Sequence, residues 1–114
     1  MISILVDEAH AFDMLSILQL KAAKSPKELP KYSTFMLNMG IQIGPAIASI
    51  MVSDEYAALL EANTKVFNYL TEIDKGVQLE AKVVHDANMR RFYAKQDLQN
   101  KYFGSELEEQ KTVR

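Results

Sequence analysis

Residues 53–77 read SDEYAALLEANTKVFNYLTEIDKGV, and this stretch decides the fold. Its mostly apolar seam positions recur at spacings of three and four residues, as in a helix that buries one narrow face against a partner helix. The seam consists of Tyr56, Leu59, Asn63, Val66, Leu70, Ile73 and Val77. Ser53 before Asp54 is a typical helix start, and Gly76 is a typical helix end. The stretch therefore predicts a long helix that needs another helix beside it.

A second long helix is expected from about Leu79 to Phe103, because its residues repeat at the same spacing. Its seam reads Val84, Ala87, Arg91, Ala94 and Leu98. The first helix is mostly acidic and the second mostly basic, so we expect an antiparallel hairpin in which charge selects partner and orientation. Arg91 and Asn63 occupy seam positions where a coiled coil usually has a hydrophobe, and such polar residues typically fix the register.

The N-terminal part predicts a short extended segment followed by a very apolar helix. Residues 1–6 alternate in an extended pattern and have no preceding basic residue, so they do not resemble a signal peptide. A helix is expected from Asp7 to about Lys24. Its polar stripe consists of Asp13, Ser16 and Gln19. A helix that is apolar around most of its circumference has to be covered on more than one side.

The middle of the chain predicts a loop and then a central helix. Residues 25–31 contain two prolines and are expected to form the loop. Residues 32–53 contain no charged residue. Ser33 can cap a helix there, and Gly44-Pro45 can break or restart it. We expect this segment to supply a buried helix, either within the chain or at a subunit contact.

The same segment has one alternative interpretation, a membrane span. Three small residues are spaced by four, as on close-packed faces of membrane helices: Gly40, Gly44 and Ala48. Asn38 and Gln42 dilute the apolar character, however, and neither flank carries a basic cluster. We therefore expect no membrane span.

Length and composition fit a single helical domain, which we place at residues 1–104, with a C-terminal tail at 105–114. The chain has 114 residues and no cysteine, which excludes disulfides, thiolate zinc sites and cysteine nucleophiles. The formal net charge of −2 gives no long-range attraction to nucleic acid or anionic lipid. We expect a cytoplasmic protein.

Together these patterns predict an all-α protein of three or four helices, dominated by a long antiparallel helical hairpin. The apolar first helix and the uncharged segment offer more apolar surface than one hairpin can cover. We therefore expect a homodimer or a higher homo-oligomer.

One buried ion pair is also expected. Asp13 lies on an otherwise apolar helix and Arg91 on an otherwise apolar seam. A buried ion without a partner costs several kcal/mol, so each needs an opposite charge nearby. Asp13 and Arg91 are the best partners for each other, and Glu61 is the alternative partner for Arg91.

The preferred function is that of a non-catalytic interaction or accessory protein that self-associates. The first alternative is a metal-dependent nucleotide pyrophosphohydrolase, in which carboxylates on facing helices hold magnesium. The candidate ligands are Asp7, His10 and Asp13 on one helix face, then Glu72 with Asp74, and Glu106 with Glu109. None has the paired four-acid pattern, and the two histidines are isolated. We therefore assign no catalytic residue, metal or cofactor.

The second alternative is nucleic-acid binding. Arg90, Phe92, Tyr93 and Lys95 place cations beside aromatic rings, which can grip phosphates and stack on bases. In the competing interpretation the rings pack internally and the cations pair with the acidic helix. The negative net charge favours the competing interpretation.

The two ends of the chain carry further motifs. Near the start these are Asp13-Met-Leu-Ser-Ile-Leu18 and Lys21, and near the end Asn88-Met-Arg90-Arg91 and Gly104-Ser-Glu106-Leu-Glu-Glu109-Gln-Lys111. In these motifs the chain resembles a small family of uncharacterised bacterial and phage-borne helical proteins, which end in Gly-Ser-Glu-Leu-x-Glu-x-Lys. The resemblance implies a soluble helical fold with long paired helices. That family has no established activity, so no catalytic residue is carried over.

Overall fold

The computed structural model describes residues 2 and 5–104, and this part of the chain is all-helical. Its helices are α1 (Glu8–Lys24), α2 (Leu29–Ile43), α3 (Ala46–Met51), α4 (Asp54–Asp74) and α5 (Ala81–Tyr102), with a 3₁₀ turn, η1 (Pro26–Glu28), after α1. The all-α class is confirmed. The described residues form five α-helices, not three or four, because the uncharged segment is divided at Gly44 and Pro45. Gly44 has a φ of 83°, a conformation that suits glycine and ends α2.

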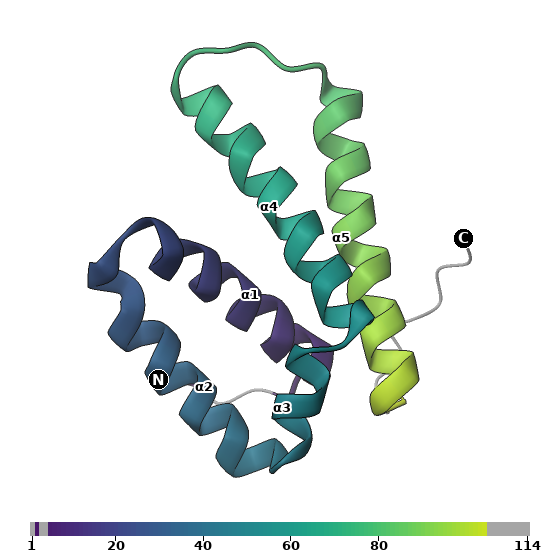
Figure 1. Ribbon diagram of the computed structural model, residues 1–114. Coiled ribbons are helices and arrows are strands. Elements are labelled where there is room, and N and C mark those ends of the chain that lie inside the picture. The colour runs from purple at the N-terminus through teal and green to yellow at the C-terminus, as the bar shows by residue number, and fades with distance from the viewer. Residues whose placement is uncertain (1, 3–4, 105–114) are drawn as a thin grey trace.

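The five helices are arranged around α1. Figure 1 shows α4 and α5 side by side and antiparallel, with α1 beside their lower halves and α2 on the other side of α1. At the lower end of the pair, Lys101 Nζ of α5 donates to Glu55 Oε1 of α4 at 2.9 Å. The short helix α3 links α2 to α4 and contacts both. Helix α1 is thus covered within the chain by α2, α4 and α5, which accounts for its nearly continuous apolar surface.

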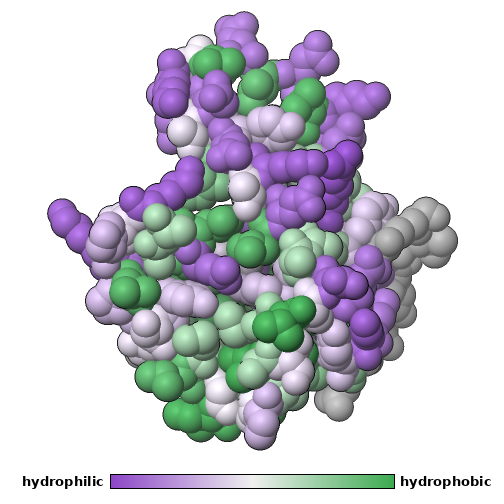
Figure 2. Space-filling view, viewed as in Figure 1, coloured by the Kyte–Doolittle hydropathy of each residue, from purple (hydrophilic) through white to green (hydrophobic). Residues whose placement is uncertain are grey.

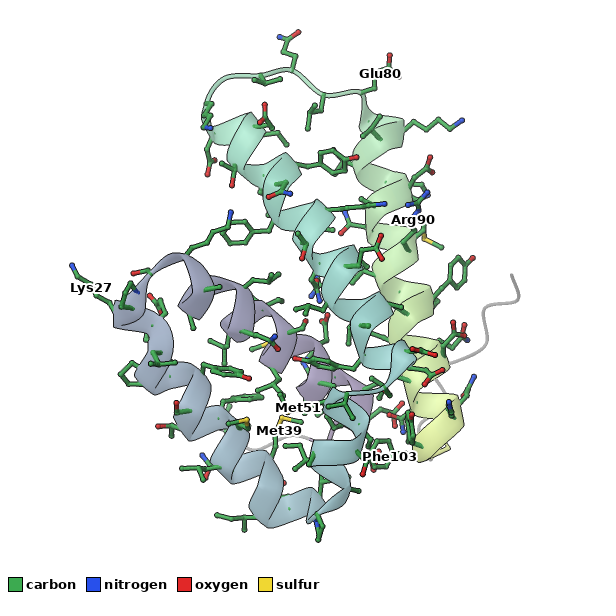
Figure 3. All side chains as sticks on the ribbon, viewed as in Figure 1. Lys27, Met39, Met51, Glu80, Arg90 and Phe103 are labelled. Atoms are coloured by element: carbon green, nitrogen blue, oxygen red, sulfur yellow. The ribbon has the colours of Figure 1, made fainter. Side chains whose placement is uncertain are left out.

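The core lies where α1 meets its neighbours. Phe12 and Leu15 of α1 are completely buried, as are Leu59 of α4 and Leu98 of α5. The Phe12 ring meets the ring of Tyr56 edge to face, with centroids 6.1 Å apart. On the α2 side, Met39 and Met51 project toward the same region in Figure 3, and both belong to this cluster of apolar side chains.

Helix starts agree with the sequence in one place and differ in another. Ser53 caps α4 as expected, since its Oγ accepts from the backbone N–H of Tyr56 at 3.1 Å. The loop expected at residues 25–31 is shorter, and the Ser33 cap is wrong, because α2 already begins at Leu29. Pro30 lies in the first turn of α2, where the missing N–H breaks no helical hydrogen bond and the fixed φ suits the helix.

The seam of α4 is buried only along its first half. Tyr56, Leu59 and Asn63 are buried, whereas Leu70 and Ile73 are 53% and 43% exposed. Figure 1 shows the cause: α4 and α5 diverge toward the linker at residues 75–80, and α1 does not extend that far. The expectation of one continuous buried seam is therefore wrong beyond about Val66.

Both expected terminal segments lie partly or wholly beyond the described part of the chain. Of the N-terminal segment, Leu5 and Val6 are described and are not helical, whereas residues 1, 3 and 4 lie outside. The tail at 105–114 also lies outside the described residues. Within residues 2 and 5–104, no helix is both long enough and apolar enough to cross a membrane.

Candidate functional site

A buried carboxylate, Asp13, lies at the junction of α1, α4 and α5. Its residue is only 1% exposed. Arg91 of α5 binds it through two hydrogen bonds, from Nε to Oδ1 at 3.0 Å and from Nη2 to Oδ2 at 2.6 Å. This bidentate arrangement is among the stronger side-chain interactions in proteins. The expected contact between Asp13 and Arg91 is thus present, and Glu61 instead lies near Lys65 on its own helix.

Three more side chains complete what we call the Asp13 cluster: Asp13, Ser16, Asn63, Arg91 and Lys95. The amide Nδ2 of Asn63 donates to Asp13 Oδ1 at 2.8 Å and to Ser16 Oγ at 2.7 Å. The Ser16 hydroxyl in turn donates to the backbone carbonyl of Asp13. Lys95 Nζ lies 3.9 Å from Asp13 Oδ2. No buried side-chain nitrogen or oxygen among the described residues lacks a hydrogen-bond partner.

The cluster holds Asp13 in its charged form. Burial raises the pKa of Asp13, but the hydrogen bonds from Arg91 and Asn63, together with the charges of Arg91 and Lys95, outweigh burial and bring the pKa below its ordinary value. The hydrogen bonds that Arg91 donates to Asp13, together with the charge of Asp13, raise the pKa of Arg91 despite its partial burial. Both partners are therefore ionised at neutral pH.

The depressed pKa of Asp13 predicts a specific loss of stability in acid. The unfolded chain binds the proton more readily, so the stabilisation is complete above the ordinary pKa of 3.8 and is lost as the pH falls through the lower pKa of the folded state. Wild type should exceed Asp13→Asn in free energy of unfolding at about pH 6, and this difference should shrink toward about pH 3. Urea titrations across this range measure it.

Asp86→Asn is the matched control for that titration, because Asp86 is exposed on α5 and has no ion-pair partner among the described residues. Its difference from wild type should stay nearly constant with pH. A constant difference for Asp13→Asn as well would contradict the assignment of the acid sensitivity to the Asp13 cluster.

Two further polar contacts join α1 to the long helices. Gln99 of α5 is completely buried; its Oε1 accepts from the backbone N–H of Ala9 at 2.7 Å, and its Nε2 donates to Glu8 Oε1 and to the Gly104 carbonyl. It thereby caps the start of α1 and the end of α5 together. Nothing in the sequence pattern distinguished Gln99 from an exposed helical residue.

At the other end of α1, Tyr56 Oη donates to Gln19 Oε1 at 2.8 Å. Burial raises the pKa of Tyr56, so the hydroxyl keeps the proton that it donates. With the Asp13 cluster and Gln99, this contact fixes α1 at three levels against α4 and α5. These contacts have a structural role, since each polar group binds another group of the chain.

The side chains considered as magnesium ligands do not come together in one group within the described part of the chain. Among the described residues, no group of three or more histidine, aspartate or glutamate side chains is placed to hold a metal ion. Asp13 is engaged by Arg91, and Asn63 takes a further position on its carboxylate. Glu106 and Glu109 lie outside the described residues.

The four residues considered for nucleic-acid contact are separated by their roles. Phe92 and Tyr93 pack edge to face, with ring centroids 5.6 Å apart, and both are partly buried. Lys95 is directed toward Asp13. Arg90 is exposed on α5, as Figure 3 shows. The rings pack as the competing interpretation of the sequence expected, but Lys95 lies near Asp13 of α1 and not near the acidic helix α4.

Helices α2 and α3 form a surface on which large apolar side chains are exposed. Along the outer side of α2, Leu37 is 68% exposed and Ile41 is 81% exposed, while Phe35, Met39 and Ile43 pack inward. We call the exposed residues of this region the uncharged face: Thr34, Leu37, Asn38, Ile41, Gln42, Pro45, Ala46, Ala48, Ser49 and Val52. Figure 2 shows this lower end largely in green and pale colours, whereas hydrophilic residues gather at the upper end.

A groove runs beside the uncharged face. It has a volume of about 920 Å³ and lies between the start of α1, the inner side of α2 and Phe103. Asn38 and Gln42 line the groove and also belong to the uncharged face. This end of the molecule therefore presents protruding apolar side chains next to a concave surface.

Comparison with models of known protein families, with curated proteins and with solved structures finds no match. Function is therefore inferred from the surfaces of the chain itself.

Proposed function

We propose that this chain is a non-catalytic, self-associating interaction protein that pairs with a second copy through the uncharged face. The observation that carries this proposal is the outer side of α2. Leu37 and Ile41 are largely exposed there, inside a segment of 22 residues, 32–53, that contains no charged side chain. The solvent side of a surface helix normally carries charged residues, and an exposed apolar patch commonly marks an interaction site.

The absence of charge favours a second copy as the occupant. In a two-fold contact, residues near the axis face their own counterparts, so a charged residue there would meet its own sign. The uncharged face avoids this repulsion along its whole length. It also leaves no charge to be buried without a partner, which would be costly.

Gly40 supports the same proposal. A glycine inside a helix is less favourable than alanine by about 0.5–1 kcal/mol. A Cβ added at Gly40 would meet nothing within 4 Å, so the packing of this chain does not require a glycine there. Gly40 lies in α2 about one helical turn after Leu37 and directly before Ile41. A glycine at this position suits the close approach of a helix from another copy.

This proposal predicts that charge on the uncharged face prevents association. Leu37→Arg with Ile41→Arg should raise the dissociation constant by about 100-fold or more, because a two-fold contact loses apolar burial on both sides and gains like charges. Helix content should stay the same, since both side chains point away from the core. Sedimentation velocity and far-UV circular dichroism measure the two effects.

Asn100→Arg is the control, since Asn100 is exposed on α5, a helix that does not contact α2. This variant should associate like the wild type. If the double arginine variant also retains the wild-type association, the uncharged face is not the contact surface.

A further inference from the structure

The upper halves of α4 and α5 present a second apolar surface, which we call the fork. On the α4 side it comprises Leu70, Ile73 and, in the linker, Val77, which are 53%, 43% and 43% exposed. On the α5 side it comprises the half-buried Val83 and Val84. The first three continue the same seam that is buried lower on α4. The sequence pattern of a buried helix face thus extends well beyond the part that this chain covers.

The seam becomes exposed where α1 ends. Along the lower half of α4, α1 forms the third side of the helix pair, through Asp13 and Ser16 at Asn63. The last contact of this kind is Lys24, whose Nζ lies 4.4 Å from the centre of the Phe67 ring. Above it α4 and α5 diverge, and Figure 2 shows green side chains among hydrophilic ones at this end. The apolar side chains at this end are therefore exposed and are not covered by further helices of the described part of the chain.

Charge indicates which helices would fit. Helix α4 carries five acidic residues and one basic residue, whereas α5 carries five basic and two acidic residues. Lys101 and Glu55 pair the two helices at the lower end, and Arg91 and Lys95 are directed to Asp13 of α1. At the upper end the charges are not used in this way. Among the described residues, Glu72 and Asp74 of α4 and Lys82 of α5 have no ion-pair partner at this end, and neither has Arg90 near the middle of α5.

We propose that the fork is a second self-association surface, occupied by the fork of another copy, with α4 of each copy packed against α5 of the other. A two-fold axis then places Glu72 and Asp74 near Lys82 and Arg90 of the second copy twice, and the apolar fork residues lie between them. This inference rests on the proposed self-association and adds a surface to it. Two different two-fold contacts on one chain lead to an assembly larger than a dimer.

The test is a mixing experiment with two charge-reversed proteins. One carries Glu72→Lys and Asp74→Lys, and the other carries Lys82→Glu and Arg90→Glu. Both also carry Leu37→Arg and Ile41→Arg, so association through the uncharged face does not contribute. Each protein alone brings like charges together across the fork, whereas the mixture restores attraction at both contacts. At low salt, the mixed pair should therefore associate at least tenfold more tightly than either protein with itself, by fluorescence energy transfer between labelled chains.

The matched control is the ion pair of Glu55 and Lys101, which forms within one chain. Proteins with Glu55→Lys and with Lys101→Glu, in the same background, should gain nothing from mixing. Equal affinity of the mixed and unmixed fork variants would overturn the inference. The outcome is independent of the uncharged face, since that face is altered in every protein compared. Failure of the proposed function appears separately, in proteins whose fork is altered by Glu72→Lys and Asp74→Lys. If adding Leu37→Arg and Ile41→Arg to such a protein leaves its association unchanged, the uncharged face is not a contact surface.

Discussion

Replacing Arg91 by leucine is expected to lower the free energy of unfolding by about 3 kcal/mol. Asp13 would remain buried and charged, with Asn63 as its hydrogen-bond donor and Lys95 at 3.9 Å, too far for a good hydrogen bond. Breaking a buried ion pair from one side typically costs about 3–5 kcal/mol. We expect the lower end of that range, since the Arg91 side chain is 31% exposed and water can reach the gap. Urea unfolding at neutral pH gives the value.

Arg90→Leu is the matched control, one residue away on the same helix. Arg90 is exposed and has no ion-pair partner among the described residues, so its replacement should change stability by less than about 0.5 kcal/mol. A double-mutant cycle with Asp13→Asn and Arg91→Gln should show a coupling of about 1 kcal/mol or more. Equal effects of Arg91→Leu and Arg90→Leu, or additive effects in the cycle, would contradict a stabilising Asp13–Arg91 pair.

Gln99→Leu should have the second largest effect, a loss of about 2–3 kcal/mol. Leucine fills a similar volume but leaves the buried N–H of Ala9 and the carbonyl of Gly104 without the groups that bind them. A buried polar group without a partner costs about 1–3 kcal/mol. Because Gln99 joins the start of α1 to α5, we also expect faster amide hydrogen exchange in the first turn of α1.

Asn100→Leu tests whether that loss comes from hydrogen bonding or merely from a leucine near the end of α5. Asn100 is exposed, so its replacement should leave stability nearly unchanged. Gln99→Glu adds a second comparison, because it keeps an acceptor for Ala9 but places a second carboxylate beside Glu8. If Gln99→Leu is as stable as Asn100→Leu, the capping role of Gln99 is wrong.

The Asp13–Arg91 contact could be predicted from the sequence because its cause does not depend on topology. Any fold that buries Asp13 and Arg91 at apolar positions has to give each an opposite charge. The start of α4 could also be predicted, since a capping serine acts on the turn that follows it and its effect does not depend on tertiary structure. The role of Gln99 could not be predicted from the sequence, because a helical glutamine has the same local pattern whether it is exposed or caps another helix.

The exposed end of the seam shows a second limit. Spacing of Leu70 and Ile73 indicates which side of α4 prefers burial, but the extent of burial depends on where α1 ends and how α5 is tilted. Likewise, because α1 is apolar around most of its circumference, the sequence predicted several neighbouring helices, but it did not indicate whether they belong to the same chain. They do, so α1 no longer supports an oligomer, and that expectation now depends on the uncharged face and the fork.

Self-association is the central claim, and the mass of the full chain in solution tests it most directly. Sedimentation equilibrium over a concentration series up to the high micromolar range gives that mass without labels or substitutions. We predict at least twice the mass of one chain at the upper end of the series, with dissociation on dilution. The mass of a single chain at every concentration would contradict the proposal.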